Sequence, residues 1–179
     1  MTATSRPLAD GDHVVLVGMT GSGKTTVGRQ LAAALGRQLV DSDAQVEART
    51  GRTVRQIFEA DGEAAYRQLE REALVAALDG AEPSVVAAAG GVVLDPANRS
   101  ALRSAGTVVW LRADPEVLAR RVSRGRDHRP LLGDDPRAAL VRLDAERRPL
   151  YEEVADHVVD VDELGSAQVA ARVVELVSG

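Results

Sequence analysis

The sequence predicts an α/β fold, a three-layer α/β/α arrangement with a central, mostly parallel five-stranded sheet. Short apolar runs rich in β-branched residues alternate with segments of helical periodicity, and a glycine-rich turn follows the first run. Strands that alternate with helices form parallel sheets that helices cover on both faces. A strand buried on both faces reads as a continuous apolar run, which is the pattern seen here.

Five apolar runs are predicted as strands, and helical periodicity fills the intervals between them. The strands are expected at 13–17, 39–43, 85–88, 107–111 and 158–161. Apolar residues recur with helical spacing over 24–35, around residue 46, over 54–58 and 63–78, and over 166–177. Gly36 directly follows the first helical segment and is expected to end it.

The length of 179 residues suits one domain with a full-sized core. We expect this domain to cover residues 13–179 and a disordered polar tail to cover 1–12. Hydrophobic residues make up 45% of the chain and aromatic residues only 2%. The core must therefore be built mainly from alanine, valine and leucine.

Composition and charge argue against several kinds of function. The formal net charge of -5 disfavours binding to nucleic acids or membrane surfaces, which are themselves polyanionic. The apolar runs are far shorter than the roughly 20 residues of a membrane-spanning helix. The chain has no cysteine, which excludes disulfides and thiol catalysis and fits a reducing compartment. We expect a cytoplasmic monomer without nucleic-acid or membrane partners.

The turn after the first strand matches the phosphate-binding pattern G-x-x-x-x-G-K-[ST] without a gap, as Gly18-Met19-Thr20-Gly21-Ser22-Gly23-Lys24-Thr25. The glycines let successive backbone N–H groups turn toward an anion, and the following helix adds its N-terminal dipole. Lys24 is expected to contact the outer phosphates of ATP, and the Thr25 hydroxyl to ligate Mg²⁺. The alternative is a glycine-rich turn that binds nothing, but the flanking strand and helix favour a P-loop. The motif does not identify the phosphoryl acceptor.

Two carboxylates, Asp41 and Asp43, end the second predicted strand. The carboxyl ends of parallel strands face the ligand crevice of an open α/β sheet. If the segment is extended, the two side chains lie on the same side, about 7 Å apart along the backbone. One would then serve the metal while the other accepts a proton from an attacking hydroxyl. A helix N-cap followed by a first-turn acid is an equally good interpretation.

Four further polar segments have ordinary interpretations when each is considered alone. Arg67 and Glu70 lie three residues apart, as on a solvated helical face. The turn at 89–91 is either a simple tight turn or a close approach of backbone to a ligand. The arginines of R-P-L-L at 129–132 and R-R-P-L-Y at 147–151 are typical of surface charge. The first of these runs lies in 120–136, a stretch rich in Arg, Gly, Asp and Pro that predicts a mobile loop.

In combination the motifs are far more specific. The order P-loop, D-S-D, Y-R-x-x-E, G-G, R-P-L-L and R-R-P-L-Y closely resembles the shikimate kinase family, from about residue 14 to the C-terminus. The resemblance implies a P-loop kinase architecture like that of nucleoside-monophosphate kinases. It also implies ATP-dependent phosphorylation of shikimate to shikimate 3-phosphate, in the chorismate pathway to the aromatic amino acids.

The resemblance assigns one group of residues to ATP and Mg²⁺. The nucleotide contacts would come from Gly21, Ser22, Gly23, Lys24, Thr25, Thr26, Arg121 and Arg129. Thr25 and Asp41 correspond to the positions that support Mg²⁺. Arg121 corresponds to an arginine that packs against adenine, and Arg129 to the lid arginine that reaches the phosphates and the substrate.

A second group is assigned to shikimate, which carries one carboxylate and three hydroxyls. Asp43 corresponds to the residue that contacts the hydroxyls and is the expected base. Arg67 and Arg147 correspond to two carboxylate-binding arginines, as suits paired, charge-assisted hydrogen bonds. Gly90 and Gly91 match a glycine turn that touches the ring. Lys24, Asp43 and Arg129 are the expected catalytic residues, under a lid at about 120–136 that excludes water.

Two positions depart from the family pattern. Ala89 stands where the first of three glycines is usual, and it is strained if that position needs a positive φ but harmless otherwise. Tyr66 stands where phenylalanine is more usual and adds one hydroxyl near the site. Neither change removes a charged group that the chemistry requires.

Two other functions are weighed against phosphorylation of shikimate. A different small-molecule kinase of the same architecture, such as a gluconate or nucleoside-monophosphate kinase, would also need the P-loop. The chain has only four aromatic residues, too few to favour stacking on a nucleobase acceptor: Phe58, Tyr66, Trp110 and Tyr151. A non-catalytic nucleotide-binding module would have little reason to keep Lys24, Asp43 and Arg129 together.

Overall fold

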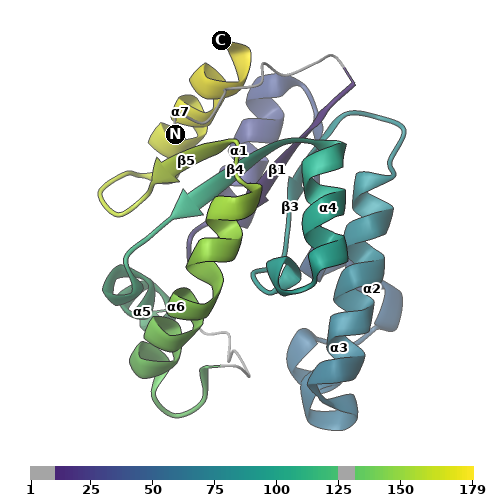
Figure 1. The fold of residues 1–179 in the computed structure, drawn as a ribbon, viewed down its shortest axis with the longest axis vertical. Helices are drawn as coiled ribbons and strands as arrows, with labels where there is room; N and C mark the ends of the chain where they lie inside the picture. The colour runs from purple at the N-terminus through teal and green to yellow at the C-terminus, as the bar shows by residue number, and fades with distance from the viewer. Residues whose placement is uncertain (1–10, 125–131) are drawn as a thin grey trace.

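One parallel sheet forms the centre of the computed structural model, which describes residues 11–124 and 132–179 (Figure 1). The strands are β1 (His13–Val17), β2 (Gln38–Asp41), β3 (Ser84–Ala87), β4 (Gly106–Arg112) and β5 (His157–Asp160). Their order is β2-β3-β1-β4-β5, and every neighbouring pair is parallel. The chain moves to one side of β1 for β2 and β3 and to the other for β4 and β5. This change of direction marks the point where such sheets bind ligands.

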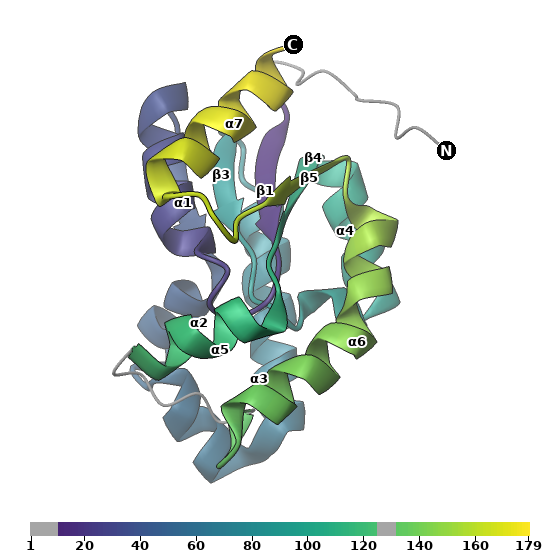
Figure 2. The same cartoon turned by 90° about the vertical axis from the view of Figure 1, so that its left-hand side faces the viewer.

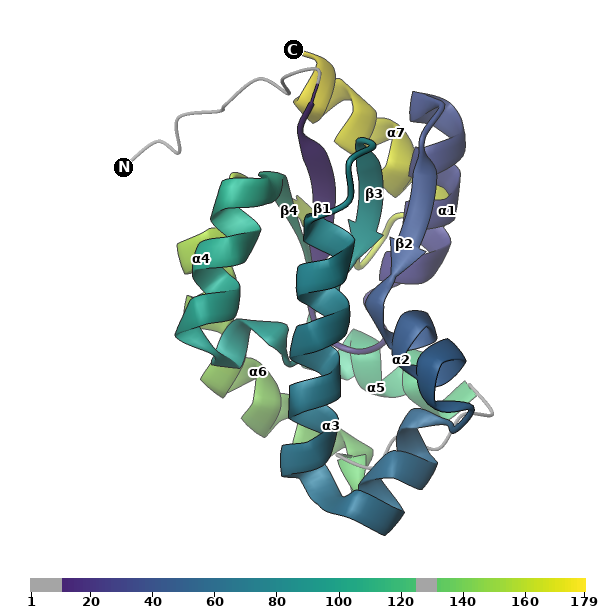
Figure 3. The same cartoon turned by 90° about the vertical axis from the view of Figure 1, so that its right-hand side faces the viewer.

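Helices cover both faces of the sheet, which confirms the predicted three-layer fold. They are α1 (Lys24–Leu35), α2 (Ser42–Thr50), α3 (Val54–Leu78), the 3₁₀ helix η1 (Val92–Leu94), α4 (Pro96–Ala105), α5 (Pro115–Arg124), α6 (Pro136–Val154) and α7 (Ser166–Ser178). Figures 2 and 3 show α1 and α7 on one face, with α4 and α6 on the other. In the same views α2, α5 and the lower part of α3 gather below the carboxyl ends of the strands.

The core is built from small aliphatic residues, as the composition requires. All residues of β1 are buried, and β4 is buried over its first six residues. Trp110 and Tyr151 are the largest fully buried side chains and stack on each other. A second, smaller cluster joins α2 and α3 through Val46, Ile57, Tyr66 and Ala73.

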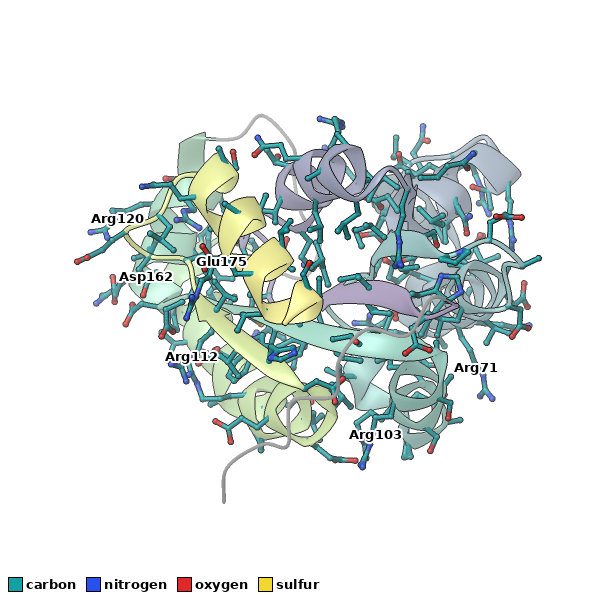
Figure 4. All side chains as sticks on the ribbon, turned by 90° about the horizontal axis from the view of Figure 1, so that it is seen from above. Arg71, Arg103, Arg112, Arg120, Asp162 and Glu175 are labelled. Carbon is teal, nitrogen blue, oxygen red and sulfur yellow. The ribbon has the colours of Figure 1, made fainter. Side chains whose placement is uncertain are left out.

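Many charged side chains lie at the periphery of the molecule. Figure 4 looks from above onto the sheet and its helices, and its labelled residues point away from the ribbon. They are Arg71, Arg103, Arg112, Arg120, Asp162 and Glu175. Some of these charges pair at the surface, as Arg112 does with Asp160. Such exposed pairs contribute little to stability.

Three element boundaries differ from the predicted ones. β2 ends at Asp41 and α2 begins at Ser42, so the strand does not extend to residue 43. The segments predicted at 54–58 and 63–78 belong to one element, α3, which is interrupted by a non-helical Gly62. Residues 120–124 are helical in α5 and Pro136 begins α6, so these parts of the stretch predicted as a loop are helical.

Two predictions concern parts of the chain outside the described residues, namely 1–10 of the predicted tail and 125–131 of the predicted lid. Among the residues that the structure does describe, no helix is both long enough and apolar enough to cross a membrane.

Candidate active site

The P-loop turns tightly between β1 and α1. Gly18, Gly21 and Gly23 all have positive φ, the region in which side chains are disfavoured. A Cβ atom at Gly18 would lie 2.6 Å from the carbonyl oxygen of Leu111, so that position also lacks space. Lys24 begins α1, and its Nζ donates to the carbonyl oxygens of Gly18 at 2.7 Å and Met19 at 3.0 Å. The loop is therefore folded back around its own lysine.

A cavity of about 390 Å³ opens beside this loop. It brings together P-loop residues, both aspartates, one glycine of the β3 turn and a residue pair of α5. Its lining comprises Thr20, Gly21, Gly23, Lys24, Thr25, Thr26, Asp41, Asp43, Ala87, Ala88, Gly90, Arg121 and Val122. Most of the residues predicted to contact the nucleotide thus share one cavity. Ser22 is buried outside the lining, and Arg129 lies outside the described residues.

Asp41 links the end of β2 to the P-loop. Its Oδ2 accepts a hydrogen bond of 2.6 Å from the hydroxyl of Thr25. Its Oδ1 accepts from the backbone N–H of Ala44 and caps α2. A hydroxyl and a carboxylate side by side are oxygen donors of the kind that Mg²⁺ prefers, and a nucleotide metal needs few protein ligands. No cluster of three acidic or histidine ligands occurs in the described part of the chain, so any ion here would rely on phosphate and water oxygens as well.

Asp43 lies in the first turn of α2, not at the end of an extended strand. The extended geometry predicted for 41–43 is therefore wrong, and the interpretation as an N-cap followed by a first-turn acid is right. The side chain still reaches the cavity. Its Oδ1 accepts a hydrogen bond of 2.5 Å from the hydroxyl of Tyr66.

Burial keeps the Tyr66 hydroxyl in its donor form. Only 4% of this residue is exposed, and its ring lies 4.7 Å from that of Phe58. Burial raises the pKa of the Tyr66 hydroxyl, and the neighbouring carboxylates of Asp43 and Glu70 raise it further. The hydroxyl that distinguishes this chain from the usual family pattern thus stays protonated and donates to Asp43.

Arg67 pairs with two carboxylates on α3. Its guanidinium donates to Glu70 at 2.8 Å and to Glu63 at 3.1 Å. Glu70 is only 2% exposed, so its interpretation as part of a solvated face is wrong. Burial raises the pKa of the Glu70 carboxyl, while the charge of Arg67 acts in the opposite direction. A buried carboxylate that holds an arginine fixes the direction of the guanidinium.

The glycine turn after β3 lies between the two predicted carboxylate-binding arginines. A Cβ atom at Gly91 would come within 1.9 Å of Nη1 of Arg67. At Gly90 a Cβ atom would lie 3.5 Å from Nη1 of Arg147 and 3.3 Å from the carbonyl oxygen of Gly18. Neither glycine has a positive φ. Glycine suits both positions because neighbouring atoms leave little room for a side chain, and not because of the backbone conformation.

Arg147 is buried, although an arginine run usually lies at the surface. Only 4% of it is exposed, and its Nε has no hydrogen-bond partner among the described residues. The adjacent Arg148 behaves differently, since it pairs with Asp144 and is partly exposed. A buried guanidinium with an unused donor is the form expected of an anion-binding group.

Ala89 is not strained. No residue other than glycine has a positive φ in the described ranges, so the substitution of alanine for glycine is conformationally harmless. The backbone N–H of Ala89 donates to the buried hydroxyl of Ser42 at 2.9 Å. This bond ties the glycine turn to the start of α2.

Arg121 lines the cavity from α5. Its Nη2 donates to the carbonyl oxygen of Val161 at 2.6 Å, and its side chain lines the cavity with Val122. A guanidinium plane fixed in this way offers a face on which a base can stack.

Sequence reasoning missed the contacts that hold the site residues in place. The hydroxyl of Tyr151 donates to the carbonyl oxygen of Gly90 at 2.6 Å, and no prediction had assigned it a role. The bond from Ala89 to Ser42 and the burial of Glu70 were missed as well. The one available signal for Tyr151 was its place in the R-R-P-L-Y run, four residues after Arg147.

The fold and site together define a P-loop kinase for a small acceptor: a parallel sheet, a phosphate-binding loop on its central strand and a charged cavity at the carboxyl ends of the strands. The family model described as "Shikimate kinase" matches residues 20–178. The chain belongs to the shikimate kinase family.

Individual relatives agree with this assignment. The shikimate kinase of Paramagnetospirillum magneticum is 48% identical over 166 residues, which cover 92% of this chain and 84% of that protein. The structure of the shikimate kinase from Acinetobacter baumannii, in complex with shikimate, has a TM-score of 0.88 and 36% identity and covers 93% of this chain and 92% of its own.

A more distant likeness shows the fold alone. A gluconokinase from Sinorhizobium meliloti has a TM-score of 0.63 at 22% identity, covering 97% of this chain and 94% of its own. This gluconokinase thus shares the architecture of the present chain, and the fold alone does not distinguish gluconate from shikimate as the acceptor.

Proposed function

We propose that this protein transfers the γ-phosphoryl group of ATP to the 3-hydroxyl of shikimate, giving shikimate 3-phosphate and ADP. One observation carries the choice of acceptor: two arginines, Arg67 and Arg147, approach the adjacent glycines of one turn, next to the P-loop cavity. Two guanidinium groups at a shared turn suit a single carboxylate. Gluconate also has a carboxylate, so the assay below includes it.

ATP would occupy the cavity with its phosphates in the P-loop. Backbone N–H groups of Gly21, Ser22 and Gly23 and the side chains of Lys24, Thr25 and Thr26 would receive the phosphates. The adenine would stack on Arg121. Lys24 would leave its two carbonyl partners to contact the outer phosphates, where its charge stabilises the transition state.

Mg²⁺ would be held at Thr25 and Asp41, whose oxygens already lie 2.6 Å apart. The ion would supply charge neutralisation between the outer phosphates. The hydroxyl of Thr25 is a neutral ligand and Asp41 contributes one negative charge, which is the sparse protein set typical of a nucleotide-bound magnesium.

Asp43 would accept the proton of the 3-hydroxyl as that oxygen attacks the γ-phosphorus. A bond forms between the shikimate oxygen and phosphorus, and the bond from phosphorus to the β–γ bridging oxygen breaks, which leaves ADP. The Tyr66 hydroxyl donates to Oδ1 of Asp43 and would help to orient the carboxylate. Arg129, from the R-P-L-L run, would stabilise the charge on the transferred group.

An ADP-release assay with three kinds of acceptor tests the proposal. Purified protein with ATP and Mg²⁺ is given shikimate, gluconate or a panel of nucleoside monophosphates in turn. We expect release that shikimate stimulates at least tenfold over each of the others, as charged and polar complementarity in a buried site allows. Stimulation by gluconate without shikimate would reject the acceptor. Tight ATP binding with no turnover on any acceptor would favour a non-catalytic module.

We also propose that the protein works as a monomer in the cytoplasm, without nucleic-acid or membrane partners. The net charge of -5 and the absence of cysteine support this proposal. Light scattering on the eluting protein should give a mass near 18.9 kDa. A concentration-independent mass of twice that value would contradict the monomer.

A further inference from the structure

Tyr151 reaches the acceptor side of the site from the core. It lies on α6, is fully buried, and stacks on Trp110 with ring centroids 5.7 Å apart. Its hydroxyl donates to the carbonyl oxygen of Gly90, 2.6 Å away and 61 residues earlier in the chain. Because the ring is fixed by core packing, the hydroxyl fixes the turn in its place.

The same helix carries Arg147 one turn earlier, so the two side chains lie on one face of α6. Nη1 of Arg147 lies 3.5 Å from the position of a Cβ atom at Gly90. Burial raises the pKa of the Tyr151 hydroxyl, while the charge of Arg147 and a hydrogen bond from its guanidinium lower it, and Asp144 and Glu70 raise it. The net direction is upward, so the hydroxyl stays protonated and can accept from Arg147 while it donates to Gly90.

We propose that Tyr151 is a positioning residue for the acceptor: its hydroxyl holds the turn at Gly90 and Gly91 against the guanidinium of Arg147. The proposal rests on the proposed function, because it assumes that Arg147 and the turn bind the acceptor. It extends to Arg67 as well, since Gly91 lies in direct contact with that guanidinium. One hydroxyl from the core would thus set the spacing between both arginines.

The test is Tyr151→Phe, which keeps the ring and its stacking on Trp110 and removes only the hydroxyl. Loss of a hydrogen bond to a buried carbonyl should raise the KM for shikimate about tenfold. The KM for ATP and kcat should stay within about twofold, because the lost hydrogen bond is to the carbonyl oxygen of Gly90 and not to a phosphate-binding group.

Ser84→Ala is the matched control. Ser84 is also buried, its hydroxyl lies 2.9 Å from Nδ1 of His13, and it begins β3 at the end opposite to the turn. Thermal unfolding of both variants measures their loss of stability. The control should lose comparable stability and keep the KM for shikimate.

The possible outcomes separate the positioning role from a merely structural one. A higher KM for shikimate in Tyr151→Phe alone supports the proposal. An unchanged KM for shikimate, or equal changes for shikimate and ATP, would overturn it, as would the same shift in Ser84→Ala. Absence of shikimate turnover in the wild-type protein would instead reject the proposed function, and this inference with it.

Discussion

At the scale of one residue, the site depends on the absence of a side chain at Gly91. An added methyl group would fall 1.9 Å from Nη1 and 2.6 Å from Cζ of Arg67. Arg67 is a flexible side chain whose end can move, so the protein would fold, but with its guanidinium displaced from Glu70.

We therefore expect Gly91→Ala to raise the KM for shikimate by about tenfold or more, with the KM for ATP nearly unchanged. Steady-state kinetics with each substrate in turn measure the two constants. Gly80→Ala is the control, because a Cβ atom there meets only ordinary contacts, at 3.4 Å and beyond. Equal KM values for shikimate in Gly91→Ala and wild type would argue against a role for Arg67 in binding.

Residue identities in the site were largely predictable, but their partners were not. The P-loop is contiguous, and its glycines follow from backbone conformation, so the sequence alone identifies it. Tyr66 and Asp43 are 23 residues apart, and Tyr151 and Gly90 are 61 apart. Periodicity shows which side chains are buried, but it carries no information on which distant group each one meets.

At the scale of elements, the break in α3 is set by Gly62. Its φ of 83° and ψ of 174° belong to a region that only glycine occupies readily. The segment before the break packs on α2 through Ile57 and Val46, and the segment after it carries Tyr66 and Arg67. A Cβ atom at Gly62 would have no neighbouring atom within 4 Å, so space does not require glycine here.

We expect Gly62→Ala to lower the free energy of unfolding by about 1–3 kcal/mol through backbone strain alone. Urea denaturation measures this difference. Gly11→Ala serves as the control, because Gly11 has open space around it and no positive φ. A variant at Gly62 as stable as the wild type would contradict the strained backbone.

The junction of β2 and α2 explains why one predicted boundary was wrong. An aspartate at the end of a strand fits both an extended continuation and a helix N-cap. The structure has the cap, because Oδ1 of Asp41 accepts from the N–H of Ala44. The apolar pattern cannot separate the two options over so short a stretch, because both keep Val40 at the sheet.

At the scale of the whole molecule, the strand order converts a linear set of motifs into one site. Residues after β1, β2 and β3 line the same cavity, because these three strands are neighbours and parallel. The alternation of strands and helices predicted this sheet but not the order of its strands. The helices α5 and α6 follow β4, which lies on the other side of β1. α5 supplies Arg121 to the cavity, and α6 brings Arg147 close to Gly90.

The central claim is the transfer of a phosphoryl group to the 3-hydroxyl of shikimate, and the product itself tests it most directly. Protein, ATP, Mg²⁺ and shikimate are incubated, and the product is identified by ³¹P–¹H correlation NMR. We predict one new phosphomonoester whose phosphorus couples to the proton on carbon 3, formed in equal amount to ADP and lost when the metal is chelated. Orthophosphate beside ADP with no new phosphomonoester, or a phosphate on another hydroxyl, would contradict the account.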